Sequence, residues 1–306
     1  CNPNEFADIR WPGPDSSPSG IRFLLSRVGF GTGISCGQCF SFPCSRRPEP
    51  FSLEKSILVS DLFVIVPARL GSQRFPRKLL HPVRGKPIIL WTADRLAAEV
   101  PDHPIHYAVA EEELKEVLED AGHEAHLTDP EHPTGTDRVA EVNLKLGADM
   151  VINAQADEPL VTGDQLLALA RLLEAGSEMC TLACPFETES DFRDPNQVKV
   201  AMDKEGRALY FSRSPIPFTR GNASWGGPGS AFRHLGLYGY SGSFLRRYVG
   251  LPQTSLEKSE RLEQLRALEH GHSIKVALTE QQTLGIDVPD DIVRFEQLLD
   301  ESGIAE

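Results

Sequence analysis

Regularly alternating strand and helix signals, which begin at Leu62, constrain the fold of this chain more than any other feature. The continuous apolar run from Leu62 to Pro67 is typical of a strand that is covered on both faces. Further strands are expected over residues 105–110 and 150–154, with helical patterns between them. This alternation predicts an α/β fold built on a mostly parallel, doubly wound sheet.

The helices expected between these strands are marked by apolar spacing and by their end residues. They cover residues 87–96, 111–121, 136–146 and 164–173. Pro87 fits the first helical position of the first helix. Gly122 and Gly147 are expected to end the second and third helices, and Thr136 is the expected N-cap of the third.

The pattern changes after about residue 180. Strands with one solvated face are expected over residues 197–202 and 235–240, a further strand over 274–278, and helices over 260–269 and 290–299. Thr254 and Glu257 have the spacing of a capping box, and Pro289 opens the last helix. We therefore expect one α/β domain over residues 61–306, with a smaller β-rich part at about 186–255.

Residues 1–60 differ from the rest, because they are rich in Pro, Gly, Ser and Cys and show little periodicity. We interpret them as a disordered or non-native N-terminal extension. Cys36 and Cys39 have the spacing of half a zinc knuckle, and Cys44 offers a third ligand. A zinc-dependent interaction protein built on this segment is therefore an alternative.

The charge of the chain limits its partners. Its 306 residues carry a formal net charge of -13, which argues against non-specific binding to nucleic acid or to an anionic membrane. No apolar run reaches the roughly 18 residues of a membrane-spanning helix. No signal-peptide pattern is visible, so we expect a cytoplasmic protein with reduced thiols.

A basic loop follows the first predicted strand, at the edge where α/β sheets bind ligands. Arg69, Arg74 and Lys78 supply positive charge, and Gly71 and Ser72 can present backbone N–H groups. Such a loop can hold a triphosphate, although a solvated surface loop would have the same composition. The spacing is neither that of a P-loop nor that of a dinucleotide fingerprint.

Two carboxylates that are far apart in the sequence are candidate ligands for Mg²⁺. Asp157 follows the strand predicted at 150–154, at the same sheet edge as the basic loop. Mg²⁺ prefers oxygen ligands and commonly binds one or two carboxylates together with phosphate oxygens. Asp287 would be the second carboxylate, or would simply cap the last helix.

Together with polar groups of the second half, these motifs resemble the 3-deoxy-manno-octulosonate cytidylyltransferases, the CMP-Kdo synthetases. The resemblance runs from about Phe63 to Leu299. Its most specific parts are Tyr-Phe-Ser-Arg at 210–213, Arg-His-Leu-Gly-x-Tyr-Gly-Tyr at 233–240 and Leu-Glu-Gln-Leu-Arg at 262–266. It implies transfer of CMP from CTP to the anomeric hydroxyl of Kdo, with Mg²⁺ as cofactor, for lipopolysaccharide synthesis. It also implies a homodimer in which the β-rich part supplies much of the interface.

The resemblance assigns roles to residues that match the family motifs. Catalytic roles fall to Lys78, Arg74 and Asp157, and Mg²⁺ binding to Asp157 and Asp287. The nucleotide would be bound by Pro67, Ala68, Arg69, Ser72, Arg74, Lys78, Gly135, Thr136 and Arg138. The sugar acid would be bound by Gln155, Arg213, His234, Tyr238, Glu263 and Gln264.

Three departures from the family pattern stand in or beside these motifs. Ala156 replaces the usual Gly, which matters only if the backbone there has a positive φ. Leu70-Gly71 replaces a frequent Tyr-Ala, and Arg77 stands where Gly is common. The alternatives are a cytidylyltransferase for another sugar acid, such as 8-amino-Kdo or sialic acid, and a non-catalytic sugar-nucleotide-binding module.

Overall fold

The computed structural model describes residues 62–72, 74–220, 225 and 230–302. The extension expected at residues 1–60, with its zinc-knuckle cysteines, lies outside these residues. In the described part of the chain, no helix has both the length and the apolar character that crossing a membrane requires.

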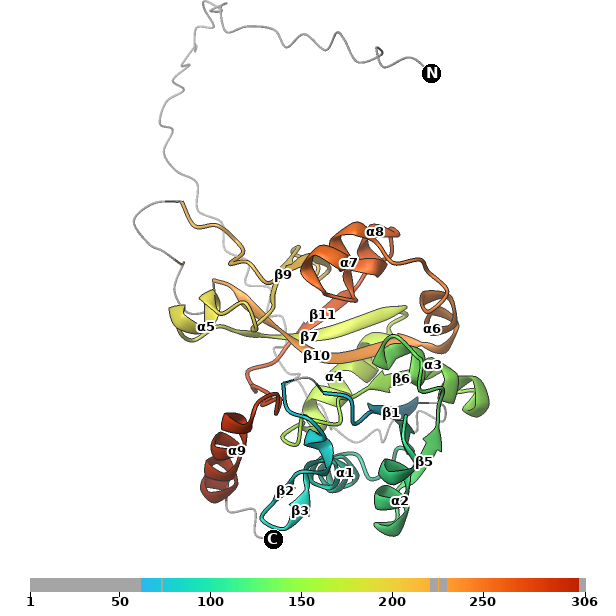
Figure 1. Cartoon of the computed structure of the whole chain (residues 1–306). Coiled ribbons are helices and arrows are strands. Elements are labelled where there is room, and N and C mark those ends of the chain that lie inside the picture. The colour runs from blue at the N-terminus through green and yellow to red at the C-terminus, as the bar shows by residue number, and fades with distance from the viewer. Residues whose placement is uncertain (1–61, 73, 221–224, 226–229, 303–306) are drawn as a thin grey trace, which may run out of the picture. The chain divides into compact units, whose positions relative to one another are not determined.

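A nine-stranded sheet runs through the described residues (Figure 1), in the order β11-β7-β10-β6-β1-β4-β5, with β8 and β9 extending from β10. The strands are β1 (Leu62–Ala68), β4 (Ile105–Val109), β5 (Glu124–Leu127), β6 (Met150–Asn153), β7 (Met179–Pro185), β8 (Lys199–Met202), β9 (Ala208–Ser212), β10 (Phe232–Ser241) and β11 (Lys275–Leu278). β1 pairs in parallel with β4 and β6, and β4 with β5. The predicted α/β fold is confirmed.

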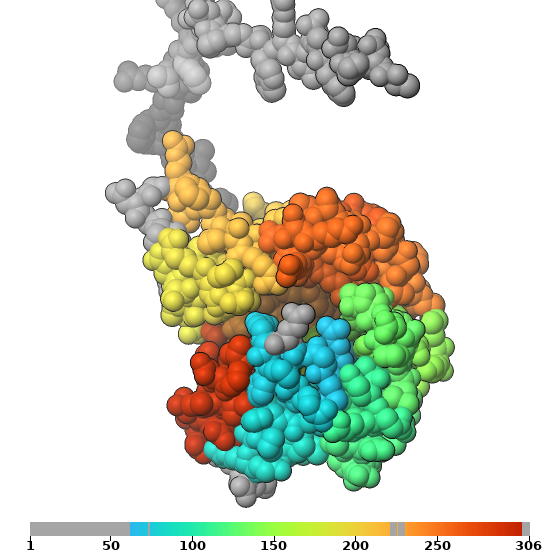
Figure 2. Space-filling model, viewed as in Figure 1, coloured from blue at the N-terminus to red at the C-terminus, as the bar shows by residue number. Residues whose placement is uncertain are grey.

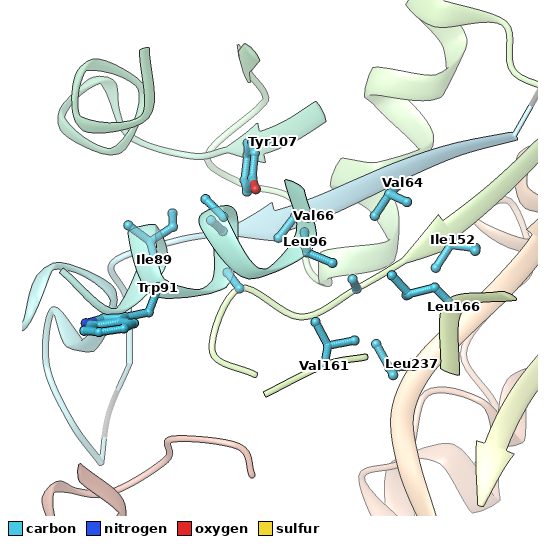
Figure 3. Close-up of a cluster of buried hydrophobic side chains, with 14 of the residues drawn as sticks. Val64, Val66, Ile89, Trp91, Leu96, Tyr107, Ile152, Val161, Leu166 and Leu237 are labelled. Carbon is cyan, nitrogen blue, oxygen red and sulfur yellow. The ribbon is translucent and has the colours of Figure 1, made fainter. Parts of the chain in front are cut away.

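Helices cover both faces of this sheet. One face is covered by α1 (Ile88–Glu99), α2 (Glu112–Asp120), α4 (Gly163–Glu174) and α9 (Pro289–Ser302). The other is covered by α3 (Gly135–Leu146), α6 (Gly242–Tyr248) and α8 (Leu265–Glu269). Figure 3 shows the first core, where Leu96 of α1 lies close to Val66 of β1; Ile89 and Val64 belong to the same cluster. Burial of such side chains is the main favourable term for the fold.

Short elements complete the described chain: η1 (Lys78–Leu80), β2 (Pro82–Val83), β3 (Lys86–Pro87), α5 (Glu189–Arg193) and α7 (Ser255–Glu260). The helix predicted to begin at Pro87 begins one residue later, with Pro87 as its N-cap. The strand predicted at 105–110 and the helices ending at Gly122 and Gly147 are present within a residue or two.

The prediction of a solvated face on the strand at 235–240 was wrong. β10 lies between β6 and β7 and pairs with both in antiparallel register. Leu235 and Leu237 belong to one core, whereas Tyr240 belongs to the other. The β-rich part therefore continues into the centre of the main sheet through this strand.

The N-cap of α3 is Thr134, and the prediction of Thr136 was wrong. The Thr134 hydroxyl accepts from the Asp137 N–H at 3.3 Å, and the Asp137 carboxylate accepts from the Thr134 N–H at 3.0 Å. This reciprocal pair is a capping box. Thr136 is the second residue of the helix and is buried.

The single helix predicted at 260–269 is interrupted. The capping box at Thr254 and Glu257 is confirmed, but it starts α7, which ends at Glu260. Arg261 then adopts a left-handed conformation, with φ of 53°, and α8 begins at Leu265. The turn between the two helices places Arg261 at the wall of a cleft.

Candidate active site

A cleft of about 810 Å³ opens beyond the carboxyl ends of β1 and β6. Figure 2 shows it as a hollow between the blue and cyan segment after β1 and the orange residues of α7 and α8. Ten of the residues predicted for the site line it: Pro67, Ala68, Arg69, Ser72, Arg74, Lys78, Gly135, Arg138, Gln155 and Asp157. The basic loop and the first acidic motif therefore meet, as the α/β topology predicted.

Lys78 joins the two carboxylates that were predicted to act together. Its Nζ donates to Oδ2 of Asp157, to the carbonyl of Ile286 at 2.9 Å and to Oδ1 of Asp287 at 3.1 Å. Arg74 Nη2 pairs with the other oxygen of Asp287 at 3.0 Å. Asp287 is therefore part of the same site, although its side chain is about half exposed at the edge of the cleft.

The charge of Lys78 is stabilised by these contacts. Burial alone would lower the pKa of its ammonium group, but the charges and hydrogen bonds of Asp157 and Asp287 outweigh burial and raise the pKa above its ordinary value. The group is consequently a fixed cation at neutral pH.

Backbone contacts bring Asp287 to this place. The Ile286 N–H donates to the Asp157 carbonyl at 2.9 Å, which ties the segment before α9 to the loop after β6. The N–H groups of Asp287 and Val288 donate to Asp291 Oδ2 at 2.8 and 2.9 Å. Asp291 thus accepts these N–H groups at the start of α9, and the carboxylate of Asp287 faces Lys78 and Arg74 instead.

The basic loop is shaped by its own backbone and by Glu111. The Leu70 N–H donates to both carboxylate oxygens of Glu111 at 3.1 Å, and the Arg77 N–H donates to the Leu70 carbonyl at 3.3 Å. Arg77 has a φ of 57°, which explains why glycine is favourable at this position. Within the described residues Arg69 forms no ion pair, so its guanidinium can receive an anion.

The start of α3 forms another wall of the cleft. A Cβ added to Gly135 would lie 3.1 Å from Cγ of Pro67, so a larger residue would push α3 away from β1. Arg138 is buried, and it donates to the Thr128 hydroxyl and to the Asp129 carbonyl at 2.9 and 2.7 Å. Arg138 therefore frames the cleft by holding the loop after β5.

The replacement of the family's glycine by Ala156 does not strain the loop that carries Asp157. Within the described residues, the residues other than glycine with positive φ are Arg77, Arg84 and Arg261. Ala156 is buried, and its carbonyl accepts from the Thr92 hydroxyl at 2.9 Å. The left-handed conformation that would require glycine is thus not needed here.

The residues predicted for the sugar acid divide into two groups. Gln155 lines the cleft and donates to the Gly236 carbonyl at 3.1 Å. His234 and Tyr238 lie together on β10, with ring centroids 5.4 Å apart. Burial and, to a smaller extent, the neighbouring charge of Arg233 lower the pKa of His234 to about 3, so its ring is neutral. Its Nε2 lies 2.9 Å from the Thr181 hydroxyl.

The remaining sugar-acid candidates lie on or beside the turn between α7 and α8. Arg213 donates to the carbonyls of Glu260 and Pro195 at 2.8 and 3.1 Å, so its guanidinium supports this turn. Burial raises the pKa of Glu263 to about 6, although hydrogen bonding by Thr136 acts in the other direction. Glu263 Oε1 and Gln264 Nε2 are buried without a hydrogen-bond partner among the described residues, and such atoms are favourable sites for a polar ligand.

Two residues of this region were not predicted. Burial and the adjacent Asp157 raise the pKa of Glu158 to about 8, and its Oε2 has no hydrogen-bond partner among the described residues. Its place beside Asp157 in the motif was the available signal. Arg261 lines the cleft from its left-handed turn, which no residue pattern indicates.

Known proteins resemble this chain in sequence and in fold. Residues 63–274 match the family model described as Cytidylyltransferase. The 3-deoxy-manno-octulosonate cytidylyltransferase of Thermodesulfovibrio yellowstonii is 42% identical over 246 residues, which cover 77% of this chain and 96% of that protein. The corresponding protein of Syntrophobacter fumaroxidans is 45% identical over 234 residues, or 74% of this chain and 92% of that protein.

Two further comparisons bear on the substrate. The 8-amino-3,8-dideoxy-manno-octulosonate cytidylyltransferase of Shewanella putrefaciens is 40% identical, covering 78% of this chain and 98% of that protein. The solved structure of CMP:2-keto-3-deoxy-manno-octonic acid synthetase complexed with CTP has a TM-score of 0.73 and 32% identity, covering 79% of this chain and 100% of that one. The chain therefore belongs to the 3-deoxy-manno-octulosonate cytidylyltransferase family.

Proposed function

We propose that this protein transfers CMP from CTP to the anomeric hydroxyl of 3-deoxy-manno-octulosonate, releasing pyrophosphate. The observation that carries the proposal is the meeting of Asp157 and Asp287 on Lys78 at the edge of a cleft lined by Arg69 and Arg74. Membership of the family supports the same reaction, because the relatives described above carry its name.

Positive charge in the cleft would hold the triphosphate. Arg69 has no ion pair within the described residues, and Arg74 is more than half exposed beside Asp287. Fixed cations aimed at a leaving pyrophosphate stabilise the charge that develops there, and they lower the barrier without reorganising. Lys78 would turn from the carboxylates to the phosphate oxygens when the nucleotide enters.

Asp157 and Asp287 would hold Mg²⁺. The donor set fits this ion, because both groups are carboxylates and both expose part of their side chains, 26% and 51% respectively. They already hold one positive group between them, the ammonium of Lys78. When bound, Mg²⁺ supplies charge neutralisation at the phosphates and favours the deprotonated form of an attacking hydroxyl.

Gln155 and Tyr238 on the sheet side, with Glu263 and Gln264 from the turn between α7 and α8, would orient the sugar acid. The anomeric oxygen must approach the α-phosphorus in line with the departing pyrophosphate, so alignment contributes much of the rate. Gln155, Glu263 and Gln264 offer amide and carboxyl groups for hydroxyls, and Tyr238 adds a phenol close to Glu263. The His234 ring, whose centroid is 5.4 Å from that of Tyr238, would position the phenol.

A second candidate substrate is the 8-amino analogue of the same sugar acid. It is favoured by the Shewanella relatives, which are 40% identical and carry that substrate in their names. The reaction and the nucleotide half of the site would be the same, so the choice depends on the pocket around carbon 8 of the sugar.

Pyrophosphate release tests both candidates in one assay. Purified protein is supplied with CTP and Mg²⁺, and then with Kdo, 8-amino-Kdo or a sialic acid in separate reactions. The proposal predicts the highest kcat/KM with Kdo. A higher value with 8-amino-Kdo would select the second candidate, and CTP binding without release with any sugar acid would identify a binding module.

We also propose that the protein is a homodimer joined through its β-rich part. Phe218 is 90% exposed and Leu209 is 62% exposed in this part of the chain. A groove of about 450 Å³ beside them is lined by Met202, Pro217 and Leu278, among other residues. Exposed apolar surface of this kind commonly marks a protein interface.

A further inference from the structure

A cluster of three metal-binding side chains lies outside the cleft, on strands β4 and β5. His106 Nδ1 and His126 Nε2 are 3.1 Å apart. Glu124 Oε1 lies 3.5 Å from the first nitrogen and 3.4 Å from the second. None of the three residues lines the cleft, so neither the proposed catalysis nor Mg²⁺ binding uses them.

Strand pairing produces this convergence. β4 and β5 are parallel, with His106 opposite Glu124 and Ala108 opposite His126. Residues two apart on a strand share a face, so Glu124 and His126 both present their side chains beside His106. Phe63 on β1 stacks against the His106 ring with centroids 5.3 Å apart and so restrains its orientation.

The spacing of the three atoms matches a coordination shell. Zn²⁺ binds nitrogen and oxygen at about 2.0 to 2.2 Å in tetrahedral sites, so its ligand atoms lie roughly 3.3 to 3.6 Å from one another. The separations here, 3.1, 3.4 and 3.5 Å, lie close to that range. Within the described residues, no lysine or arginine pairs with Glu124, so no side-chain cation already neutralises this carboxylate.

We propose that His106, Glu124 and His126 bind a divalent transition-metal ion of the zinc type, with a solvent molecule as a fourth ligand. Two imidazoles suit zinc and similar ions, whereas Mg²⁺ prefers oxygen ligands. Glu124 is exposed and His126 is partly exposed, so the ion can enter and a water can complete the shell. In the described sheet β5 lies at the edge and pairs with β4, and the ion fastens these two strands.

Zinc binding to the full-length chain tests this proposal. Cys1, Cys36, Cys39 and Cys44 are replaced by serine throughout, because their thiolates would bind zinc themselves. Excess Mg²⁺ is present to occupy sites made of oxygen. Titration calorimetry with Zn²⁺ is expected to give one ion per chain. In thermal unfolding, the midpoint temperature is expected to rise with zinc concentration.

Two variants at the accessible ligands show whether this cluster is the site. His126→Gln and Glu124→Gln are each expected to weaken zinc binding by at least about tenfold and to remove the thermal shift. His132→Gln is the matched control, because His132 Nε2 also pairs with a glutamate, Glu141, at 2.8 Å but has no second histidine. Stoichiometric zinc binding that both cluster variants retain, or no zinc binding by the parent chain, overturns the proposal.

Discussion

The ammonium of Lys78 joins two carboxylates that lie 79 and 209 residues away from it in the sequence, those of Asp157 and Asp287. Three separate segments meet at this point: the loop after β1, the loop after β6 and the residues before α9. The contact places two candidate metal ligands and a fixed cation side by side at the mouth of the cleft. A metal ion bound to these carboxylates, as proposed, would therefore compete with Lys78 for them.

This competition gives a prediction for Lys78→Met. Without the ammonium, two carboxylates remain close together, so the free energy of unfolding should fall by roughly 1 to 3 kcal/mol, less than for a fully buried pair. Mg²⁺ should then stabilise the variant more than the wild type, while pyrophosphate release falls at least about a hundredfold. Thermal unfolding with and without Mg²⁺ measures the first effect, and an absence of any Mg²⁺ response in the variant contradicts the competition.

Ala156→Gly tests whether the departure from the family motif matters. The backbone there has no need of a left-handed conformation, so glycine gains nothing in the folded state and loses a buried methyl group. We expect the free energy of unfolding to fall by about 0.5 to 1.5 kcal/mol, with turnover essentially unchanged. Denaturant titration and the pyrophosphate assay check both values. A large gain in turnover would instead mean that Ala156 impairs the loop of Asp157.

The sequence predicted the arrangement of the nucleotide half well, for a physical reason. Parallel strands place their carboxyl ends on one edge, so the basic loop after residue 68 and the acidic motif after residue 153 had to meet there. Asp287 could not be placed in this way, because its position depends on the backbone bond between Ile286 and Asp157. The residues alone left Asp287 open as a second metal ligand or a helix cap, and the family resemblance favoured the metal ligand.

The elements that were missed carry weak local signals. β7 consists of buried, mostly small side chains, including Cys180 and Thr181, with neither helical spacing nor alternation. The alternating pattern of β10 suggested a solvated face, yet aromatic rings and helices cover it in the folded chain. The helix is broken at Arg261, whose φ is positive. Arginine rarely adopts a positive φ, so the local pattern predicted a continuous helix.

His234 should make the protein sensitive to mild acid. Its pKa falls from 6.5 in the unfolded chain to about 3 in the folded protein, so the unfolded state takes up a proton first as the pH decreases. The stabilisation is fully present above pH 6.5 and is lost as the pH falls towards 3. Between pH 7 and 5 the wild type should lose about 1 to 2 kcal/mol more unfolding free energy than His234→Asn. Urea titrations at the two pH values measure this difference, and equal losses contradict a buried neutral ring.

The proposed dimer gives a prediction for Phe218. A charge placed in an apolar interface is costly, so Phe218→Asp should convert dimers to monomers at micromolar concentration. Leu144→Asp is the matched control, because Leu144 is 65% exposed on α3, outside the β-rich part. Light scattering coupled to gel filtration gives the masses. A dimer that survives Phe218→Asp, or dissociates equally with Leu144→Asp, excludes this interface.

The most direct test of the proposed reaction is the rate of pyrophosphate release by Asp157→Asn with CTP, Kdo and saturating Mg²⁺. The amide keeps the size of the side chain but removes the charge, and Asp102→Asn in an exposed loop serves as the control. We expect a folded variant whose turnover falls at least about a hundredfold while the control is unaffected. Near-normal turnover by Asp157→Asn would contradict the assignment of this carboxylate to the reaction.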